Sequence, residues 1–246
     1  MGVEIGMIRV SVAVATYNGE KYIAKQLESI LDEIGEQDEI VISDDGSTDR
    51  TLAIIREFMQ SDARVHLLNG PKQGVKKNFE HAIRGCVGEY IFLCDQDDIW
   101  ISGKVAKVLQ TFETEKCSLV IHDAIVVEED GETVILPSFY EERGSKAGAF
   151  KNVWKNSYIG CCMAFNRELL DKILPIPNNI EMHDQWIGVI NDLDGNGTVF
   201  IPDKFLYYRR HGKNASSMKH YGIAKMIRNR LVFVKELGKR RKRYAH

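Results

Sequence analysis

Hydrophobic runs alternate with amphipathic stretches through the first hundred residues. The β-branched run from Ile8 to Ala15 is too short and too rich in valine for a helix, and it predicts a buried first strand. Residues 20–34 place apolar side chains three and four positions apart, which predicts a helix with one apolar face. The alternation continues with strands expected over residues 39–43, 65–68 and 90–94, and with helices over residues 52–59 and 75–85. This order is typical of an α/β fold with a mostly parallel sheet.

The second half of the chain has a weaker pattern. Residues 118–127 and 133–136 flank an acidic turn and predict a hairpin. Residues 137–157 have no clear periodicity and are interpreted as a mobile loop. Residues 158–165 form an apolar run, and a short helix expected from Asn166 ends before Pro175.

The segment from about Tyr221 to Arg243 combines apolar residues on one helical face with many lysines and arginines. This pattern predicts a basic helix with two possible roles. An interfacial helix would bind anionic lipid, whereas a structural helix would pack on the rest of the protein and leave its basic end in solvent.

Carboxylates follow two of the predicted strands. The cluster from Asp95 to Asp98 ends one strand, and Asp44 and Asp45 end an earlier one. The carboxyl ends of parallel strands meet at one edge of a sheet, where Tyr17 is also expected. Gathered carboxylates repel one another unless a cation or a bound donor group compensates them. The sequence therefore predicts a divalent-metal site that holds the diphosphate of a nucleotide-linked substrate.

Composition excludes several classes of protein. The chain has 246 residues and a net charge of −2, which suits one α/β domain with or without a small appendage. Its five cysteines lack C-x-x-C spacing and indicate a reduced, cytosolic chain without a zinc site. No apolar stretch approaches the roughly 20 residues that a membrane-spanning helix needs. Without a GxGxxG motif or a P-loop, dinucleotide and ATP chemistry are not expected, and one terminal basic run is too little to predict nucleic-acid binding.

Five segments, in order, resemble glycosyltransferase family 2. They are residues 12–18, 43–49, 88–100, 182–186 and 208–212, and the last two are most similar to the rhamnosyltransferase-like branch. The resemblance implies a GT-A fold over residues 1–217, with a Rossmann-like nucleotide-binding half (8–100), a mixed acceptor-side half (101–217) and a basic C-terminal helix or tail (218–246). It also implies an inverting transfer of a hexosyl or deoxyhexosyl group from a UDP- or dTDP-sugar, with Mn²⁺ or Mg²⁺ as cofactor.

Residue roles follow from the same resemblance. Tyr17 and Asp45 would line the pocket for the base, with Asp44 beside them, Lys77 near the nucleotide and Asp95 by the ribose. Asp97 would bind the metal ion, His211 would complete its coordination shell, and Asp184 would be the catalytic base. The acceptor side would contain the three aromatic candidates Trp100, His183 and Trp186.

Elementary chemistry is consistent with these roles. A hard divalent ion held by carboxylates stabilises the charge of a departing diphosphate. The acceptor hydroxyl must lose its proton to a carboxylate that stands apart from the metal, and Asp184 fits that requirement.

Each assignment also has a plainer alternative. Asp44 could be a turn residue, Asp184 a helix-start acid and His211 a solvated loop histidine, while Trp100 and Trp186 could pack in the core. Two other functions compete with sugar transfer: a nucleotide-sugar-binding protein without catalysis, and a phosphatase of the haloacid dehalogenase type.

The acceptor is expected to be a saccharide or a lipid-linked sugar in cell-envelope or surface polysaccharide synthesis. The expected location is the cytoplasm, with contact at the inner face of the cell membrane as an alternative.

Overall fold

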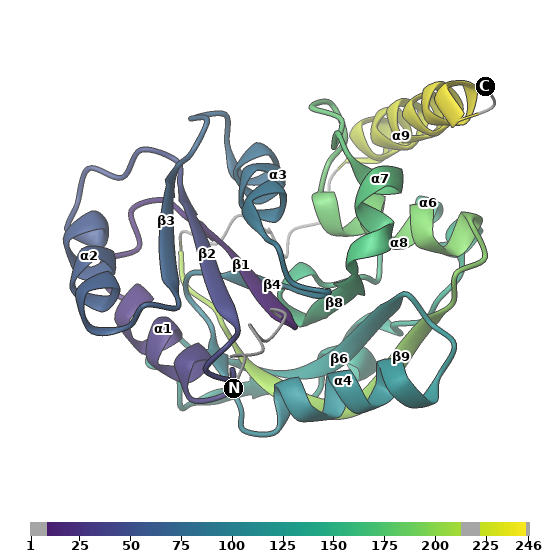
Figure 1. Cartoon of the computed structure of the whole chain (residues 1–246). Coiled ribbons are helices and arrows are strands. Elements are labelled where there is room, and N and C mark those ends of the chain that lie inside the picture. Colours follow the sequence, from purple (N-terminus) through teal and green to yellow (C-terminus); the bar gives the residue numbers. More distant parts are fainter. Residues whose placement is uncertain (1–8, 213–221, 245–246) are drawn as a thin grey trace, which may run out of the picture.

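The computed structural model describes residues 9–212 and 222–244 as a mixed α/β fold around one curled sheet (Figure 1). The predicted alternation in the first half is confirmed. It consists of β1 (Val10–Thr16), α1 (Ile23–Leu31), β2 (Glu39–Asp44), α2 (Thr51–Ser61), β3 (Val65–Asn69), α3 (Val75–Gly85) and β4 (Tyr90–Asp95).

The second half contains shorter elements. They are β5 (Ile99–Trp100), α4 (Lys104–Thr114), β6 (Leu119–Val127), β7 (Val134–Leu136), α5 (Phe139–Arg143), α6 (Ala149–Trp154), the 3₁₀ turn η1 (Gly160–Cys162), β8 (Met163–Asn166), the 3₁₀ turn η2 (Arg167–Leu169), α7 (Leu170–Ile173), α8 (His183–Leu193), β9 (Thr198–Arg209) and α9 (Ile223–Tyr244).

The sheet has the strand order β3-β2-β1-β4-β8-β6-β9-β5, with β7 paired to β6. Strands β3, β2, β1 and β4 are parallel to one another, and β6 is parallel to β9. The short strands β5, β7 and β8 pair in the antiparallel sense. In Figure 1, α1 and α2 lie on one side of strands β1 to β3, and α3 lies on the other. Both faces of β1 are therefore covered, which explains why all seven of its residues are buried.

Two sequence expectations in the second half are wrong. Residues 137–157 were expected to be a loop, but they contain α5 and α6, which are too short to show a clear helical period. Strand β9 was not expected at all. Its sequence mixes charged residues, a proline and aromatic residues, so it has no strand pattern of its own. Pairing with the buried strand β6 stabilises it as a strand.

The predicted C-terminal helix is confirmed as α9. Phe233 is buried and packs edge-on against Trp186 of α8, with ring centroids 5.8 Å apart. Arg240 donates hydrogen bonds to the Lys172 carbonyl (2.9 Å) and to Asp194 (2.7 Å). The helix therefore docks on the main fold along one face. The predicted boundary near residue 217 lies outside the described residues.

Candidate functional site

The carboxyl ends of β1, β2 and β4 lie side by side. Thr16 is the register partner of Asp44, and Ala15 is the partner of Asp95. The loops that leave these strands therefore begin at one edge of the sheet, as the sequence predicted.

The loop after β1 is fixed by the loop after β4. The side-chain amide of Gln96 accepts a hydrogen bond from the Tyr17 backbone N–H (2.9 Å) and donates one to the Tyr17 carbonyl (3.1 Å). The side chain of Tyr17 remains more than half exposed. A fixed backbone with an exposed aromatic ring can provide a stacking surface for a base.

Asp44 and Asp45 differ in their surroundings. Asp44 is buried, and its carboxylate accepts hydrogen bonds from Thr16 (3.0 Å), Gly46 (3.0 Å) and Ser47 (2.8 Å), so its interactions shape the turn. Asp45 is partly exposed and accepts hydrogen bonds from the backbone N–H groups of Gln73 (3.3 Å) and Gly74 (2.7 Å). Asp45 thus joins the loop after β2 to the start of α3.

The acidic turn after β4 faces the end of β9. Nε2 of His211 lies 2.7 Å from Oδ2 of Asp97, and the His211 ring stacks on Tyr22 with centroids 4.7 Å apart. The structure therefore brings together the two residues that were predicted to bind a metal, although 114 positions separate them in the chain.

Arg209 fixes this turn through hydrogen bonds. Its Nε donates to the Asp97 carbonyl (2.9 Å), and its Nη1 donates to the Glu129 carbonyl in the β6–β7 hairpin (2.7 Å). Its backbone N–H donates to Oδ1 of Asp98 (3.0 Å). The guanidinium also lies 5.1 Å from the centre of the Tyr22 ring. One buried cation thus joins three segments around the acidic turn.

Burial and mutual repulsion perturb the carboxylates of this turn. Burial, reinforced by the charges of Asp97 and Asp184, raises the pKa of Asp95 to about 7. Burial and the same kind of repulsion raise the pKa of Asp98 well above its usual value. Asp95, Asp98 and the Cys161 thiol have potential ligand atoms within 4.8 Å of one another. Burial also raises the pKa of Cys161, so this buried group favours protonated side chains over a thiolate–metal centre.

The donor set fits a divalent cation better at Asp97 and His211. A carboxylate and an imidazole face each other at 2.7 Å beside two further carboxylates whose repulsion a cation would relieve. Both side chains are largely buried, which excludes much of the competing water. Carboxylate and imidazole are both ordinary ligands of divalent metals.

Asp184 lies in the first turn of α8, and its charge acts on Asp95. Burial raises the pKa of Asp184 to about 6, although hydrogen bonds oppose the shift. The Gln185 backbone N–H (2.5 Å) and the Asn156 side-chain amide (3.2 Å) donate to Oδ1. A buried carboxylate with a raised pKa is a suitable proton acceptor near neutral pH.

Lys77 does not extend into this region as an isolated cation. Its Nζ donates to Glu80 (2.6 Å) and to the Ile176 carbonyl (2.7 Å). Oε2 of Glu80 also accepts a hydrogen bond from the Ile176 backbone N–H (3.0 Å). Lys77 therefore connects α3 to the loop between α7 and α8.

The three aromatic acceptor candidates are buried, which fits the core-packing alternative. Trp100 lies beneath the buried Lys104, whose Nζ is 3.8 Å from the centre of its ring. Trp186 donates through its indole N–H to the Ile173 carbonyl (2.8 Å). His183 stacks on Phe79 at 4.2 Å, and burial lowers its pKa to about 3. None of the three has an exposed ring face for a sugar, so the proposed site omits them.

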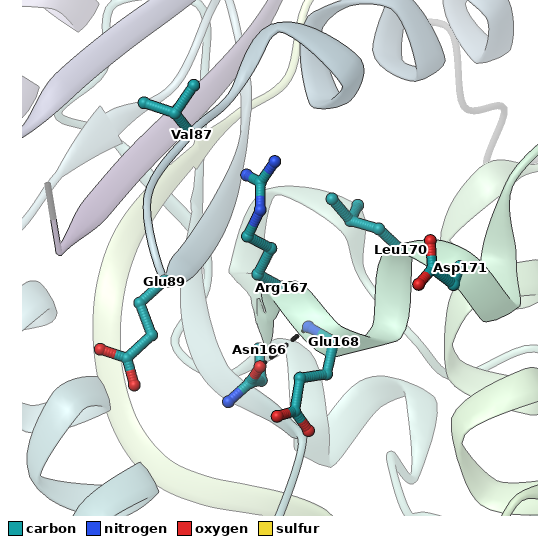
Figure 2. A pocket seen from close by; sticks show the side chains of 7 residues that line it. All are labelled: Val87, Glu89, Asn166, Arg167, Glu168, Leu170 and Asp171. Carbon is teal, nitrogen blue, oxygen red and sulfur yellow. Dashed lines mark hydrogen bonds between the residues drawn. The ribbon is translucent and has the colours of Figure 1, made fainter.

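A separate surface cavity of about 470 Å³ lies near the start of β4, at the opposite end of that strand from Asp95 (Figure 2). Its lining residues are Val87, Glu89, Asn166, Arg167, Glu168, Leu170 and Asp171. Arg167 at its centre donates to the Cys86 carbonyl (2.6 Å). The cavity is therefore distinct from the acidic turn.

Sequence reasoning missed several residues that build the site. It gave no role to Gln96, Asn156 or Tyr22, and it quoted Arg209 only as part of a resembling segment. Gln96 lies within the acidic cluster itself, so its position in the sequence was a signal that could have identified it. The function of Asn156 depends on a contact across 28 positions, for which the sequence gives no local signal.

Comparisons with known protein families agree with this architecture. A family model described as "Glycosyl transferase family 2" matches residues 11–174. The dTDP-rhamnosyl transferase RfbG of Shigella flexneri is 28% identical over 235 residues, which cover 88% of this chain and 79% of that protein. The putative teichuronic acid biosynthesis glycosyltransferase TuaG of Bacillus subtilis (strain 168) is 29% identical over 185 residues, which cover 74% and 71%.

Solved structures show the same fold. The S. aureus TarS 1-349 structure in complex with UDP-GlcNAc has a TM-score of 0.71 at 20% identity and matches 92% of this chain. The mannosyltransferase PcManGT from Pyrobaculum calidifontis, in complex with GDP-Man and Mn²⁺, has a TM-score of 0.64 at 17% identity and matches 87% of this chain. The match spans 66% of the TarS chain and 62% of the PcManGT chain. The fold is therefore of the GT-A type.

Proposed function

Because the chain belongs to glycosyl transferase family 2, we propose that it transfers a sugar from a nucleotide-diphosphate sugar to an acceptor hydroxyl, with inversion at the anomeric carbon. The observation that most supports the proposal is the 2.7 Å distance between Nε2 of His211 and Oδ2 of Asp97. Asp184 is not part of this pair, but its charge acts on the neighbouring Asp95. A cation site and a separate base are the two parts that such a displacement needs.

The donor is proposed to be a UDP- or dTDP-sugar. TarS has been solved with UDP-GlcNAc, PcManGT with GDP-Man, and RfbG is named as a dTDP-rhamnosyl transferase. In this chain the exposed ring of Tyr17 would stack on the base. Asp45 lies at the junction with the start of α3, where it could accept a hydrogen bond from the base.

A divalent ion, Mn²⁺ or Mg²⁺, is proposed to be held by Asp97 and His211. When bound, such an ion supplies Lewis-acid stabilisation of the departing diphosphate. Arg209 fixes the backbone of Asp97 and so holds its carboxylate in position. Asp95, at the end of β4, would contact the ribose.

Asp184 is proposed as the general base. Its position in the first turn of α8 and its contacts with Gln185 and Asn156 orient the carboxylate. With a pKa of about 6 it is mostly ionised at neutral pH, yet it is more basic than an ordinary aspartate. It would take the proton of the attacking hydroxyl.

The acceptor is proposed to be a saccharide or lipid-linked sugar in cell-envelope or surface polysaccharide synthesis. The similarity to TuaG, whose name refers to teichuronic acid biosynthesis, supports this choice.

The Asp97→Ala variant tests the proposal. Calorimetric titration with UDP- and dTDP-sugars should show metal-dependent binding to the unmodified protein and loss of that binding in Asp97→Ala, because the cation then lacks its carboxylate ligand. Asp203→Ala is the matched control, since Asp203 is an exposed acid on β9. Unchanged metal-dependent affinity in a folded Asp97→Ala protein contradicts the proposal. Donor binding without any transfer or donor hydrolysis would identify the non-catalytic binding protein instead.

A further inference from the structure

We propose that the outer face of α9, together with the exposed face of α6, is a docking surface for anionic lipid bilayers. The surface consists of Phe150, Trp154, Ile227, Leu231 and Val234, and is called the α6–α9 patch below. The proposal rests on exposure, spacing and charge, and it does not depend on the transfer reaction.

Helix α9 has two apolar faces, of which the fold uses one. The face that packs on the main fold contains Phe233 and Leu237. About a quarter of a turn further around the helix, next to the docked face, Ile227, Leu231 and Val234 are 48%, 67% and 53% exposed. Their spacing of four and then three residues places them on one stripe of the helix. A single buried face would have been enough to dock α9, so the second stripe has no role in the packing described.

Helix α6 extends the stripe with two aromatic residues. Phe150 is 92% exposed and Trp154 is 68% exposed, and they are four positions apart on the same helix. The guanidinium of Arg230 in α9 lies 4.4 Å from the centre of the Trp154 ring, and its Nε donates to the Trp154 carbonyl (2.8 Å). In Figure 1, α6 lies beside α8 near the docked side of α9. The two helices therefore present large apolar side chains as neighbours, a feature that marks interaction sites on soluble domains.

The positive charge around the α6–α9 patch favours an anionic bilayer as its partner. Helix α9 carries nine lysines and arginines and a single glutamate. Arg228, Lys235 and Arg241 are exposed on the same helix as the apolar stripe. An exposed apolar stripe bordered by cations is the pattern of a helix that lies in the interface of an anionic membrane, and aromatic residues such as Trp154 favour that interface. A second copy of the chain would bring like charges together, which disfavours self-association through this face.

The patch is also close to the proposed base along the chain. Asn156, two residues after Trp154, donates its side-chain hydrogen bond to Asp184. If the proposed transfer reaction is correct, docking through the α6–α9 patch would bring the acceptor side of the site to a bilayer that holds a lipid-linked sugar. This step alone rests on the proposed function.

Intrinsic fluorescence gives a local test. The chain has three tryptophans, of which Trp100 and Trp186 are buried and Trp154 is exposed. Vesicles of phosphatidylcholine with about one third phosphatidylglycerol should therefore shift the emission to shorter wavelength, because Trp154 moves from water to the interface. Pure phosphatidylcholine vesicles, or high salt, should cause little change, because the basic border then has no anionic surface or is screened. Trp154→Phe should remove the shift.

Co-sedimentation with the same vesicles measures the whole surface. Leu231→Gln should weaken partitioning by about tenfold, because the apolar side chain that would enter the lipid interface is replaced by a polar one. Val134→Gln is the matched control, since Val134 is also an exposed apolar residue, at 54%, but lies on β7. Donor binding should be unchanged in both variants, which separates this test from that of the proposed function.

Three outcomes would overturn the proposal. They are equal sedimentation of Leu231→Gln and the unmodified protein, vesicle binding without a change in Trp154 emission, and a lipid-independent emission shift that follows protein concentration. The last result would identify the patch as a contact between copies of the chain.

Discussion

Asp184 shows at the scale of one residue how a fold can maintain an unfavourable charge. Its side chain is buried in the first turn of α8, and burial raises its pKa to about 6 from the usual 3.8. The hydrogen bonds from Gln185, Asn156 and Gly160 oppose the shift without cancelling it. The raised pKa makes the carboxylate a stronger base, and it also makes the ionised folded protein less stable than it would otherwise be.

The first prediction concerns the rate of transfer. A general base must be deprotonated, so kcat should be constant above pH 7 and should fall as the pH decreases through about 6. Asp184→Asn should bind donor normally and lose transfer by about 10²-fold or more. Steady-state kinetics from pH 5 to 8, with donor binding measured by calorimetry, checks both statements. Near-normal turnover in Asp184→Asn would show that another group is the base.

The second prediction concerns stability at the same residue. The folded protein binds the Asp184 proton more tightly than the unfolded chain does, so this residue lowers the free energy of unfolding as the pH rises from about 4 to about 6. Asparagine does not ionise and escapes that loss. Asp184→Asn should therefore be more stable than the unmodified protein at pH 8, by on the order of 1–3 kcal/mol, with a smaller difference at pH 4. Thermal unfolding at both pH values measures the difference, and a gap that does not change with pH would argue against a raised pKa.

At the scale of elements, the site is made by loops from both halves of the sheet. The acidic turn after β4 is held by Arg209 at the end of β9, and the same guanidinium also binds the β6–β7 hairpin. Tyr22, just before α1, is part of the same contact because its ring lies near both His211 and Arg209. The acidic turn, which is proposed to bind the donor, is therefore physically linked to the arrangement of the second half.

The third prediction tests this link. Arg209→Lys keeps the positive charge but cannot hold the Asp97 and Glu129 carbonyls with one rigid fork. Metal-dependent donor affinity should fall by about tenfold, and the free energy of unfolding should decrease by about 1–3 kcal/mol as a buried carbonyl loses its partner. Arg210→Lys, at the neighbouring position, is the control for calorimetry and denaturation. Equal effects of the two substitutions would mean that Arg209 has no special role in holding the turn.

The first-half elements could be predicted because their signals are local. Strand β4 and helix α3 show apolar periods that the structure follows within a residue, and the acidic residues at strand ends necessarily meet at one edge. Strand β9 could not be found because its stability comes from pairing with β6, which no local pattern encodes. The sequence also did not reveal which way Trp100 and Trp186 point, because an aromatic residue near a site is equally compatible with the core.

At the scale of the whole molecule, one apolar core joins β1 to α9. The buried cluster includes Val10 in the first strand and Phe233 in the last helix, and it crosses the division expected near residue 100. Within the described ranges, no helix combines the length and the hydropathy needed to cross a membrane. Helix α9 is part of the same core through Phe233, which packs on Trp186.

The fourth prediction separates the two faces of α9 by their effects on stability. Phe233→Ala removes a buried ring that packs on Trp186, and it should lower the free energy of unfolding by about 3 kcal/mol through lost burial and the cavity that remains. Leu231→Ala, on the same helix but exposed, should change it by less than about 0.5 kcal/mol. Urea denaturation followed by circular dichroism measures both values. If the two substitutions cost the same, α9 does not dock through Phe233, and the stripe formed by Ile227, Leu231 and Val234 would no longer be its outer face.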